Sequence, residues 1–204
     1  MYNPIWEDVD FNDAPTLVDR INRELKDCQF DAITTLVRRH NLSFYAEFDL
    51  YEFEDTGSEP ALTRRALVNS DQIFILNWTN GPIYTANEAA PINVTVDNAA
   101  DYVKFFFNFV KGRHGRFVLV DNSSEIAWNG AVPEKGKEAI GKIIEPVVVT
   151  GNEDGKIILK AFMVFKDSLF RANVHVERDG MVSLSDEALV VEGMPIIEDV
   201  VDEV

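Results

Sequence analysis

The chain has 204 residues and a formal net charge of −16, and 46% of its residues are apolar. That length accommodates one larger domain or two small ones, and the apolar content is typical of a globular protein. The negative charge argues against nucleic-acid binding, because an acidic surface repels phosphates. No apolar run reaches the roughly 20 residues that a membrane helix needs, so no membrane partner is expected.

The N-terminal stretch MYNPIWEDVDFND lacks the basic and apolar regions of a signal peptide. Cys28 is the single cysteine, so no internal disulfide can form. Together these features predict a cytoplasmic protein. No pattern in the sequence indicates an oligomeric state.

Two helices are expected at the start of the chain. Apolar residues recur at helical spacing after Asn12 or Asp13, which can cap a first helix, and a second helical pattern covers residues 31–39. The alternation in SFYAEFDLYEFE (43–54) then predicts a half-buried strand. A further short helix is expected over residues 60–67.

Turn residues concentrate in TNGPIYTANEAAP (79–91), which follows IFILNW (73–78), a segment typical of a buried strand. We therefore expect residues 1–192 to form a single α+β unit with a possible seam near 79–91. Residues 193–204 are expected to form an acidic C-terminal tail.

The strongest pattern is an apolar helix that begins after Asp97 or Asn98 and ends near Lys111. Its apolar side chains cover more than half of its circumference, as in a helix surrounded by protein on most sides. We expect this phenylalanine-rich helix to form the centre of the core. A strand at 117–121 and a short helix at 135–144 follow.

Segments rich in β-branched residues end the chain and predict an antiparallel meander. They cover 146–150, 156–166, 169–177 and 181–185.

The turns of this meander predict its register. A two-residue turn at Asp167-Ser168 pairs Lys160 with His175. A three-residue turn at 178–180 pairs Val176 with Val182 and keeps the apolar residues on one face, provided that the glycine at position 180 is left-handed.

The predicted fold is therefore α+β: a curved antiparallel sheet packed on a central phenylalanine-rich helix, with helices at the N-terminus. In outline this arrangement is similar to cystatin-like and NTF2-like folds, which also pack a helix into a bent sheet. That similarity is architectural and implies no particular function.

One candidate site lies on the second face of the meander. The register places Arg171, Asn173, His175 and Glu177 there, with Lys160 beside the histidine. A base, a carboxylate and cations that converge are typical of an active-site wall. The alternative interpretation is a solvated outer face, since antiparallel sheets commonly expose one side to water.

A second candidate site is KGRHGRF (111–117), where Arg113, His114 and Arg116 could bind an anionic ligand. The alternative interpretation is a helix ending, in which Gly112 adopts the left-handed cap conformation and the cations face the negative end of the helix. A helix C-terminus is also the wrong pole for an anion.

The sequence contains no phosphate-binding glycine loop, no nucleophile elbow and no metal-ligand spacing among its histidines and its cysteine. We therefore expect no metal and no cofactor, and a catalytic role is less expected than a non-catalytic one.

Two functional hypotheses follow. The first is a non-catalytic protein that binds a protein partner with a basic surface through its own acidic surface. The second is a protein or enzyme that binds a small anionic molecule at the His175 face or at the Arg113, His114 and Arg116 loop. A cavity at either place would favour the second hypothesis.

Overall fold

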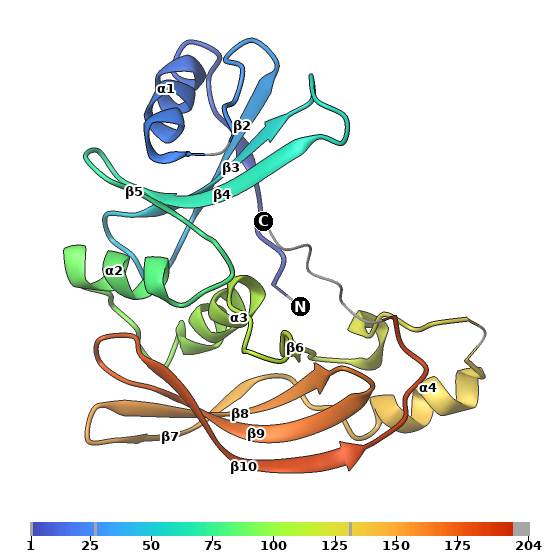
Figure 1. Ribbon diagram of the computed structural model, residues 1–204. Helices are drawn as coiled ribbons and strands as arrows, with labels where there is room; N and C mark the ends of the chain where they lie inside the picture. Colours follow the sequence, from blue (N-terminus) through green and yellow to red (C-terminus); the bar gives the residue numbers. More distant parts are fainter. Residues whose placement is uncertain (1, 27, 131, 198–204) are drawn as a thin grey trace. The chain divides into compact units, whose positions relative to one another are not determined.

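The computed structural model describes residues 2–26, 28–130 and 132–197 (Figure 1). Over this part of the chain the fold is α+β, with four α-helices and two open, mostly antiparallel sheets.

The chain divides into two compact units. Unit 1 comprises residues 1–2, 78–80 and 93–204, and unit 2 comprises residues 3–77 and 81–92. The expected single unit over 1–192, with its possible seam near 79–91, stays a prediction. Of the expected acidic tail, residues 198–204 lie outside the described residues.

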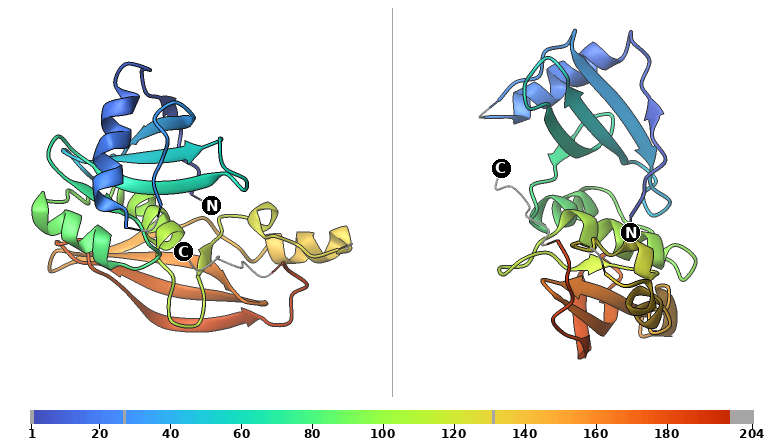
Figure 2. Two further views of the ribbon diagram at one scale, coloured as in Figure 1. Left: turned by 45° about the horizontal axis from the view of Figure 1, so that its top comes forward. Right: turned by 90° about the vertical axis from the view of Figure 1, so that its right-hand side faces the viewer.

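Unit 2 contains a five-stranded antiparallel sheet whose strands follow one another in chain order. These strands are β1 (Glu7–Asp8), β2 (Thr35–Asn41), β3 (Asp49–Asp55), β4 (Leu62–Val68) and β5 (Ile73–Ile75). Helix α1 (Ala14–Glu24) lies along this sheet (Figure 2), and α2 (Gly81–Ala89) follows β5.

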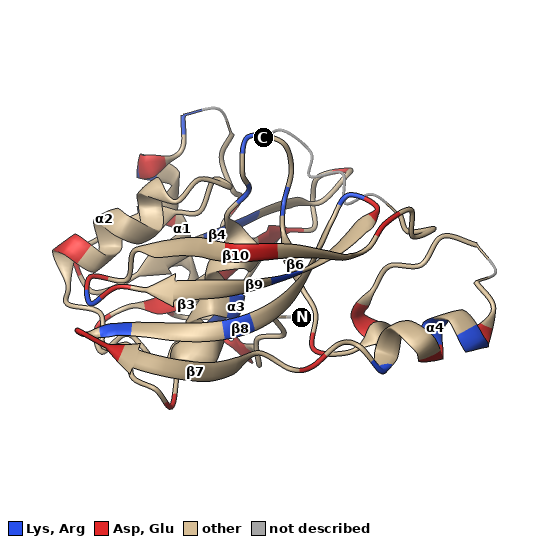
Figure 3. Ribbon diagram, turned by 90° about the horizontal axis from the view of Figure 1, so that it is seen from below, with Lys and Arg blue, Asp and Glu red and all other residues tan. Residues whose placement is uncertain are grey.

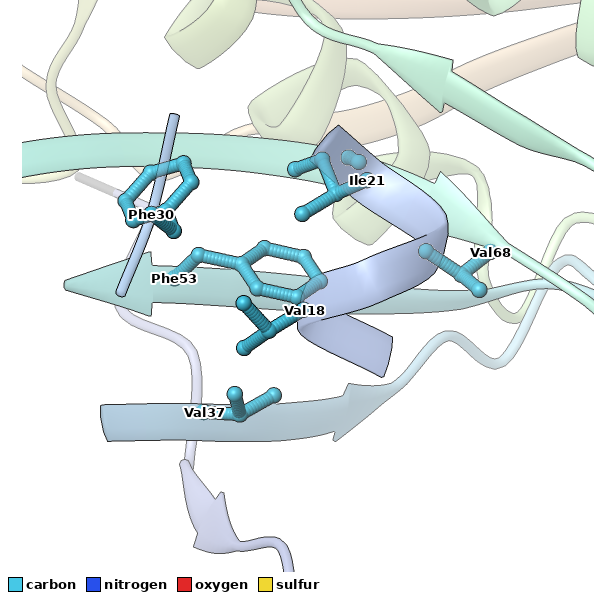
Figure 4. Close-up of a cluster of buried hydrophobic side chains, with 7 residues drawn as sticks. Val18, Ile21, Phe30, Val37, Phe53 and Val68 are labelled. Atoms are coloured by element: carbon cyan, nitrogen blue, oxygen red, sulfur yellow. The ribbon is translucent and has the colours of Figure 1, made fainter. Parts of the chain in front are cut away.

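The core of unit 2 forms between α1 and the sheet, because Val18 and Ile21 of the helix are buried against strand residues. Figure 4 shows this cluster, which also contains Phe30, Val37, Phe53, Ala66 and Val68. The first expected helix is confirmed, and it begins at Ala14, directly after the N-cap residue Asp13.

The other two helices expected in this region are wrong. Residues 31–39 contribute to β2, where Thr35 and Val37 are buried while Leu36 is 56% exposed, which is the two-residue period of a strand. Residues 60–67 contribute to β4, which pairs with β3 over its full length. In both cases pairing between distant segments overrides a local helical pattern.

The boundaries of two further elements also differ from expectation. The strand expected over 43–54 begins only at Asp49, and the turn-rich segment 79–91 contains helix α2. Pro82 is compatible with this helix because it lies in the first turn, where its missing N–H costs no hydrogen bond. Ile83 and Ala86 are fully buried in α2.

The sheet of unit 1 has the strand order β10 (Val182–Val191), β9 (Ser168–Val176), β8 (Lys156–Phe165) and β6 (Val118–Leu119). Strand β7 (Val148–Glu153) also pairs with β8. The expected C-terminal meander is therefore confirmed, and β10 extends beyond the expected end at residue 185.

Helix α3 (Ala99–Phe109) is the expected phenylalanine-rich helix, and Asn98 is its N-cap residue. It contacts β7, β8 and β9 (Figure 1). Seven of its side chains are buried, among them all four of its phenylalanines. The hydroxyl of Tyr102 donates a hydrogen bond of 2.5 Å to the carbonyl of Gly180, which ties the helix to the turn between β9 and β10.

The turn at 178–180 agrees with the sequence. Val182 is paired with Val176, and Gly180 has a φ of +80°. The preceding turn differs, because Phe165 is paired with Ser168 and the two turn residues are Lys166 and Asp167. The expected register is therefore wrong by two residues, which leaves every side chain on its predicted face.

The other face of the unit 1 sheet is partly covered. Phe162 and Val164 are 5% and 6% exposed and pack into a second apolar cluster. Its other buried members are Val120, Ile126, Ile144, Leu169 and Met194. Between β6 and β7 lie the short 3-10 helix η1 (Ser123–Glu125) and α4 (Glu134–Gly141).

Candidate functional site

The loop after α3 is a tight turn rather than a glycine-capped helix ending. Helix α3 ends at Phe109, and its C-cap residue Val110 is extended. Gly112 and Gly115 form two backbone hydrogen bonds with each other. The left-handed cap expected at Gly112 is wrong. The glycine with positive φ is Gly115, at +136°, and a Cβ there would lie 3.2 Å from the ring of Phe165.

Arg116 is held in place by two contacts within unit 1. Its Nη1 donates a hydrogen bond of 3.1 Å to the carbonyl of Asn108, and its guanidinium lies 5.7 Å from the ring centroid of Trp78. A guanidinium at this distance from an aromatic ring makes a favourable cation–π contact. Because the side chain is fixed before any ligand arrives, less entropy is lost when it binds one.

A cavity of about 560 Å³ opens beside this loop. Its walls are mostly apolar and come from β6, the end of β8, η1 with the residues after it, and the segment at 196–197. The lining residues are His114, Gly115, Arg116, Val118, Val120, Glu125, Ile126, Ala127, Val164, Phe165, Lys166, Ile196 and Ile197.

The segment at 196–197 is hydrogen-bonded to the residues that follow η1. The N–H of Ile197 donates to the carbonyl of Ala127 at 2.7 Å, and Ile196 forms a β-bridge with Trp128. The wall that contains these two isoleucines is therefore an ordered part of unit 1.

A carboxylate network lies at the η1 side of the cavity. The backbone N–H of Asp121 donates to Oε2 of Glu125 at 2.8 Å. The side chain of Asp121 accepts from Lys104 and, at 3.0 Å, from the N–H of Val147. Burial alone would raise the pKa of Asp121, but these two hydrogen bonds and the charge of Lys104 together lower that pKa below its usual value.

The predicted residues of the basic loop are separated by the structure. His114 and Arg116 line the cavity, whereas Arg113 does not line it and is exposed. Lys166 joins them at the cavity, and its φ of +52° is the left-handed conformation required by the two-residue turn.

The candidate site on the second face of the meander, around His175, does not line this cavity. Lys160 is opposite Asn173 rather than His175, because of the two-residue difference in register, and it pairs with Glu145. Glu177 forms an ion pair of 2.6 Å with Lys156, and Arg171 is exposed opposite Phe162. Figure 3 shows basic residues on β8 and β9 and acidic residues on β10.

His175 belongs to a short chain of polar groups. Its Nε2 lies 2.7 Å from Oγ of Ser185, which lies 3.1 Å from the carboxylate of Asp186, and Asn173 donates to the same carboxylate at 2.8 Å. An ionised carboxylate only accepts, so the serine donates to Asp186 and accepts from the histidine. A nucleophilic serine would instead donate to the histidine.

Sequence reasoning missed several residues of the cavity, including Lys166, Glu125 and Ile196. Lys166 could have been found from the correct turn between β8 and β9, since that turn places it next to the end of β6. Glu125 and Ile196 carry no local signal, because they reach the cavity only through tertiary structure.

Comparison with protein-family models, curated proteins and solved structures finds no match to this chain. Within the described residues, no helix is long and apolar enough to cross a membrane, and no cluster of histidine, cysteine and carboxylate side chains is placed to hold a metal ion.

Proposed function

We propose that the protein is a non-catalytic binding protein for a small anionic molecule, which occupies the cavity beside residues 114–116. The observation that carries this proposal is the combination of mostly apolar walls with Arg116, Lys166 and His114 in the lining. Ligand pockets are generally concave and mostly apolar, with a few polar groups that fix the orientation of the ligand. A volume of about 560 Å³ lies within the range of known pockets.

The charge of the lining supports an anionic ligand. The chain as a whole carries a net charge of −16, yet among the described lining residues Arg116 and Lys166 contribute two positive charges against the one carboxylate of Glu125. An acidic protein repels anions at long range, so an anion is bound only where cations are held close to it. Arginine is also a favoured partner of carboxylates and phosphates.

Binding is favoured over catalysis because the described lining of the cavity includes no serine, threonine or cysteine that could act as a nucleophile. The hydrogen bonding of Ser185 and His175 likewise differs from that of a nucleophile and its base.

Three further proposals concern a protein partner, the location of the protein and its fold. An acidic surface that binds a basic protein partner is supported by the net charge, the absence of catalytic motifs and the acidic C-terminal sequence. The cytoplasmic location is supported by the N-terminal sequence and the single cysteine. The outline similarity of unit 1 to cystatin-like and NTF2-like folds rests on a helix that lies over an antiparallel sheet.

The test compares two arginines of one loop, of which only Arg116 lines the cavity. A thermal-shift screen of alkyl and aryl carboxylates and phosphates is expected to identify compounds that raise the melting temperature of wild type. Arg116→Ala is expected to abolish this response and Arg113→Ala to retain it. Lys166→Asn provides a second variant, because asparagine tolerates the left-handed conformation while the charge is lost.

An absence of any response in wild type would contradict the proposal. An equal loss of response in the two arginine variants would also contradict it, because only long-range charge would then be involved.

A further inference from the structure

We infer, building on the proposed binding function, that the ligand is an apolar monoanion such as an alkyl or aryl monocarboxylate, and that Glu125 excludes molecules with a second anionic group. The inference rests on the way in which charge is distributed along the cavity.

The cations lie together at one end of the β6–β8 pair. Val118 is paired with Val164, and the next pair outward is Phe117 and Phe165, whose rings are stacked at 4.7 Å between centroids. Arg116 precedes Phe117 and Lys166 follows Phe165 along the chain, so both cations belong to this end of the pair. His114 precedes the glycine that contacts Phe165, so it belongs to the same end.

The carboxylate of Glu125 lies at the opposite end. It accepts the N–H of Asp121, which is the residue after Val120. Asp121 is five positions along the chain from Arg116, and an extended chain rises about 3.3 Å per residue, so the backbone at the two ends is separated by about 16 Å. Glu125 is half-buried, and its carboxylate repels a second anion with little screening by solvent.

Apolar side chains occupy the stretch between the two ends. Val118 and Val164 come from the β6–β8 pair, and Val120, which directly follows β6, is fully buried. Ile126 and Ile196 complete this stretch. A methylene chain or an aromatic ring fits such walls, since each buried methylene group increases affinity by about fourfold.

These three features define one ligand and one orientation. The anionic head lies at Arg116 and Lys166, the apolar body lies along the valines and isoleucines, and the far end of the ligand carries no negative charge. A dicarboxylate of the same length would bring its second carboxylate to Glu125, or would leave it unpaired against an apolar wall.

The experiment measures the dissociation constants of decanoate and decanedioate by calorimetry on wild type, Glu125→Gln and Glu138→Gln. Glutamine at position 125 can still accept the N–H of Asp121, so the variant removes charge and keeps that hydrogen bond. Glu138 is an exposed residue of α4 outside the cavity lining, which makes its variant a control with the same change in net charge.

We expect wild type and Glu138→Gln to bind decanoate at least about tenfold more tightly than decanedioate. A tenfold ratio of dissociation constants corresponds to a difference of about 1.4 kcal/mol in binding free energy. In Glu125→Gln this difference is expected to narrow, through tighter binding of decanedioate.

Equal affinity of wild type for the two ligands, or an unchanged difference in Glu125→Gln, would overturn the role of Glu125 while the proposed binding function stands. Failure of both ligands to bind would overturn this inference. If the broader screen also found no anionic ligand, the proposed function would fail with it.

Discussion

Gly115 and Gly180 show how single residues position the elements of unit 1. Gly115 has a φ of +136° and lies against the ring of Phe165, so a side chain there would be strained and would meet that ring. The close approach fixes the backbone between His114 and Arg116, the two residues that the loop contributes to the cavity. Gly180 has a φ of +80° and its carbonyl accepts the hydroxyl of Tyr102.

Gly180→Val is expected to lower the free energy of unfolding by more than about 1 kcal/mol, because a branched residue is strained in the left-handed region. Chemical denaturation of wild type and variant measures this change. Gly112→Val offers a comparison, since Gly112 has no positive φ and its Cβ position has only an ordinary contact of 3.5 Å with the carbonyl of Gly115. An unchanged denaturation midpoint for Gly180→Val would contradict the role given to this turn.

The lowered pKa of Asp121 makes part of the stability of unit 1 dependent on pH. A carboxylate with a lower pKa in the folded state than in the unfolded state stabilises the fold at pH values above its unfolded pKa of about 3.9. This stabilisation is lost as the pH falls through the folded-state pKa. The hydrogen bonds from Lys104 and from the N–H of Val147 are its structural source.

Asp121→Asn is therefore expected to be less stable than wild type at neutral pH, and the difference is expected to shrink as the pH falls below about 4. Urea denaturation across this pH range measures it. A difference that stays constant with pH would show that the ionised form of Asp121 does not contribute.

At the scale of elements, α3 provides five of the six aromatic side chains that are buried in the described part of unit 1. Phe106→Ala is expected to cost about 3–5 kcal/mol, as truncation of a buried aromatic side chain does. Phe106 is 5% exposed and its ring lies near the rings of Tyr102 and Phe107. A melting temperature within a few degrees of wild type would mean that α3 is not central to the core.

The C-terminal meander could be predicted from sequence because its information is local. Turn residues and a two-residue period define its strands, and the position of Gly180 determines the last turn. The observed turn at Lys166 and Asp167 shifts the register between β8 and β9 by two residues from the predicted one. Because side chains alternate along a strand, each side chain still lies on the face of the sheet that was predicted for it.

The strands of unit 2 could not be predicted in the same way. Residues 31–39 and 60–67 have helical spacing of apolar residues, yet they pair with β3 from two sides.

The sheet of unit 2 also contains a buried carboxylate. Glu52 of β3 is only 4% exposed, and it forms ion pairs with Arg38 of β2 and Arg65 of β4. Such cross-strand pairs become visible only when the register is known.

At the scale of the whole molecule, the net charge is −16, yet the loop at 111–116 carries positive charge. The loop at 111–116 was predictable as a basic segment, and its two glycines as turn residues. The cavity itself was not predictable, because it joins residues near 114–127, 164–166 and 196–197. These segments are brought together by the β6–β8 pair and by the β-bridge between Trp128 and Ile196.

The central claim is that the cavity of unit 1 binds an apolar monoanion, and residue-level NMR titration with decanoate tests it most directly. We predict saturable shifts of backbone amides at 114–127, 164–166 and 196–197, with residues of α1 in unit 2 unaffected. Titration with decanol, which lacks the charge, is expected to give much weaker effects. Shifts centred on His175 and Glu177, or no saturable shifts at all, would contradict this account.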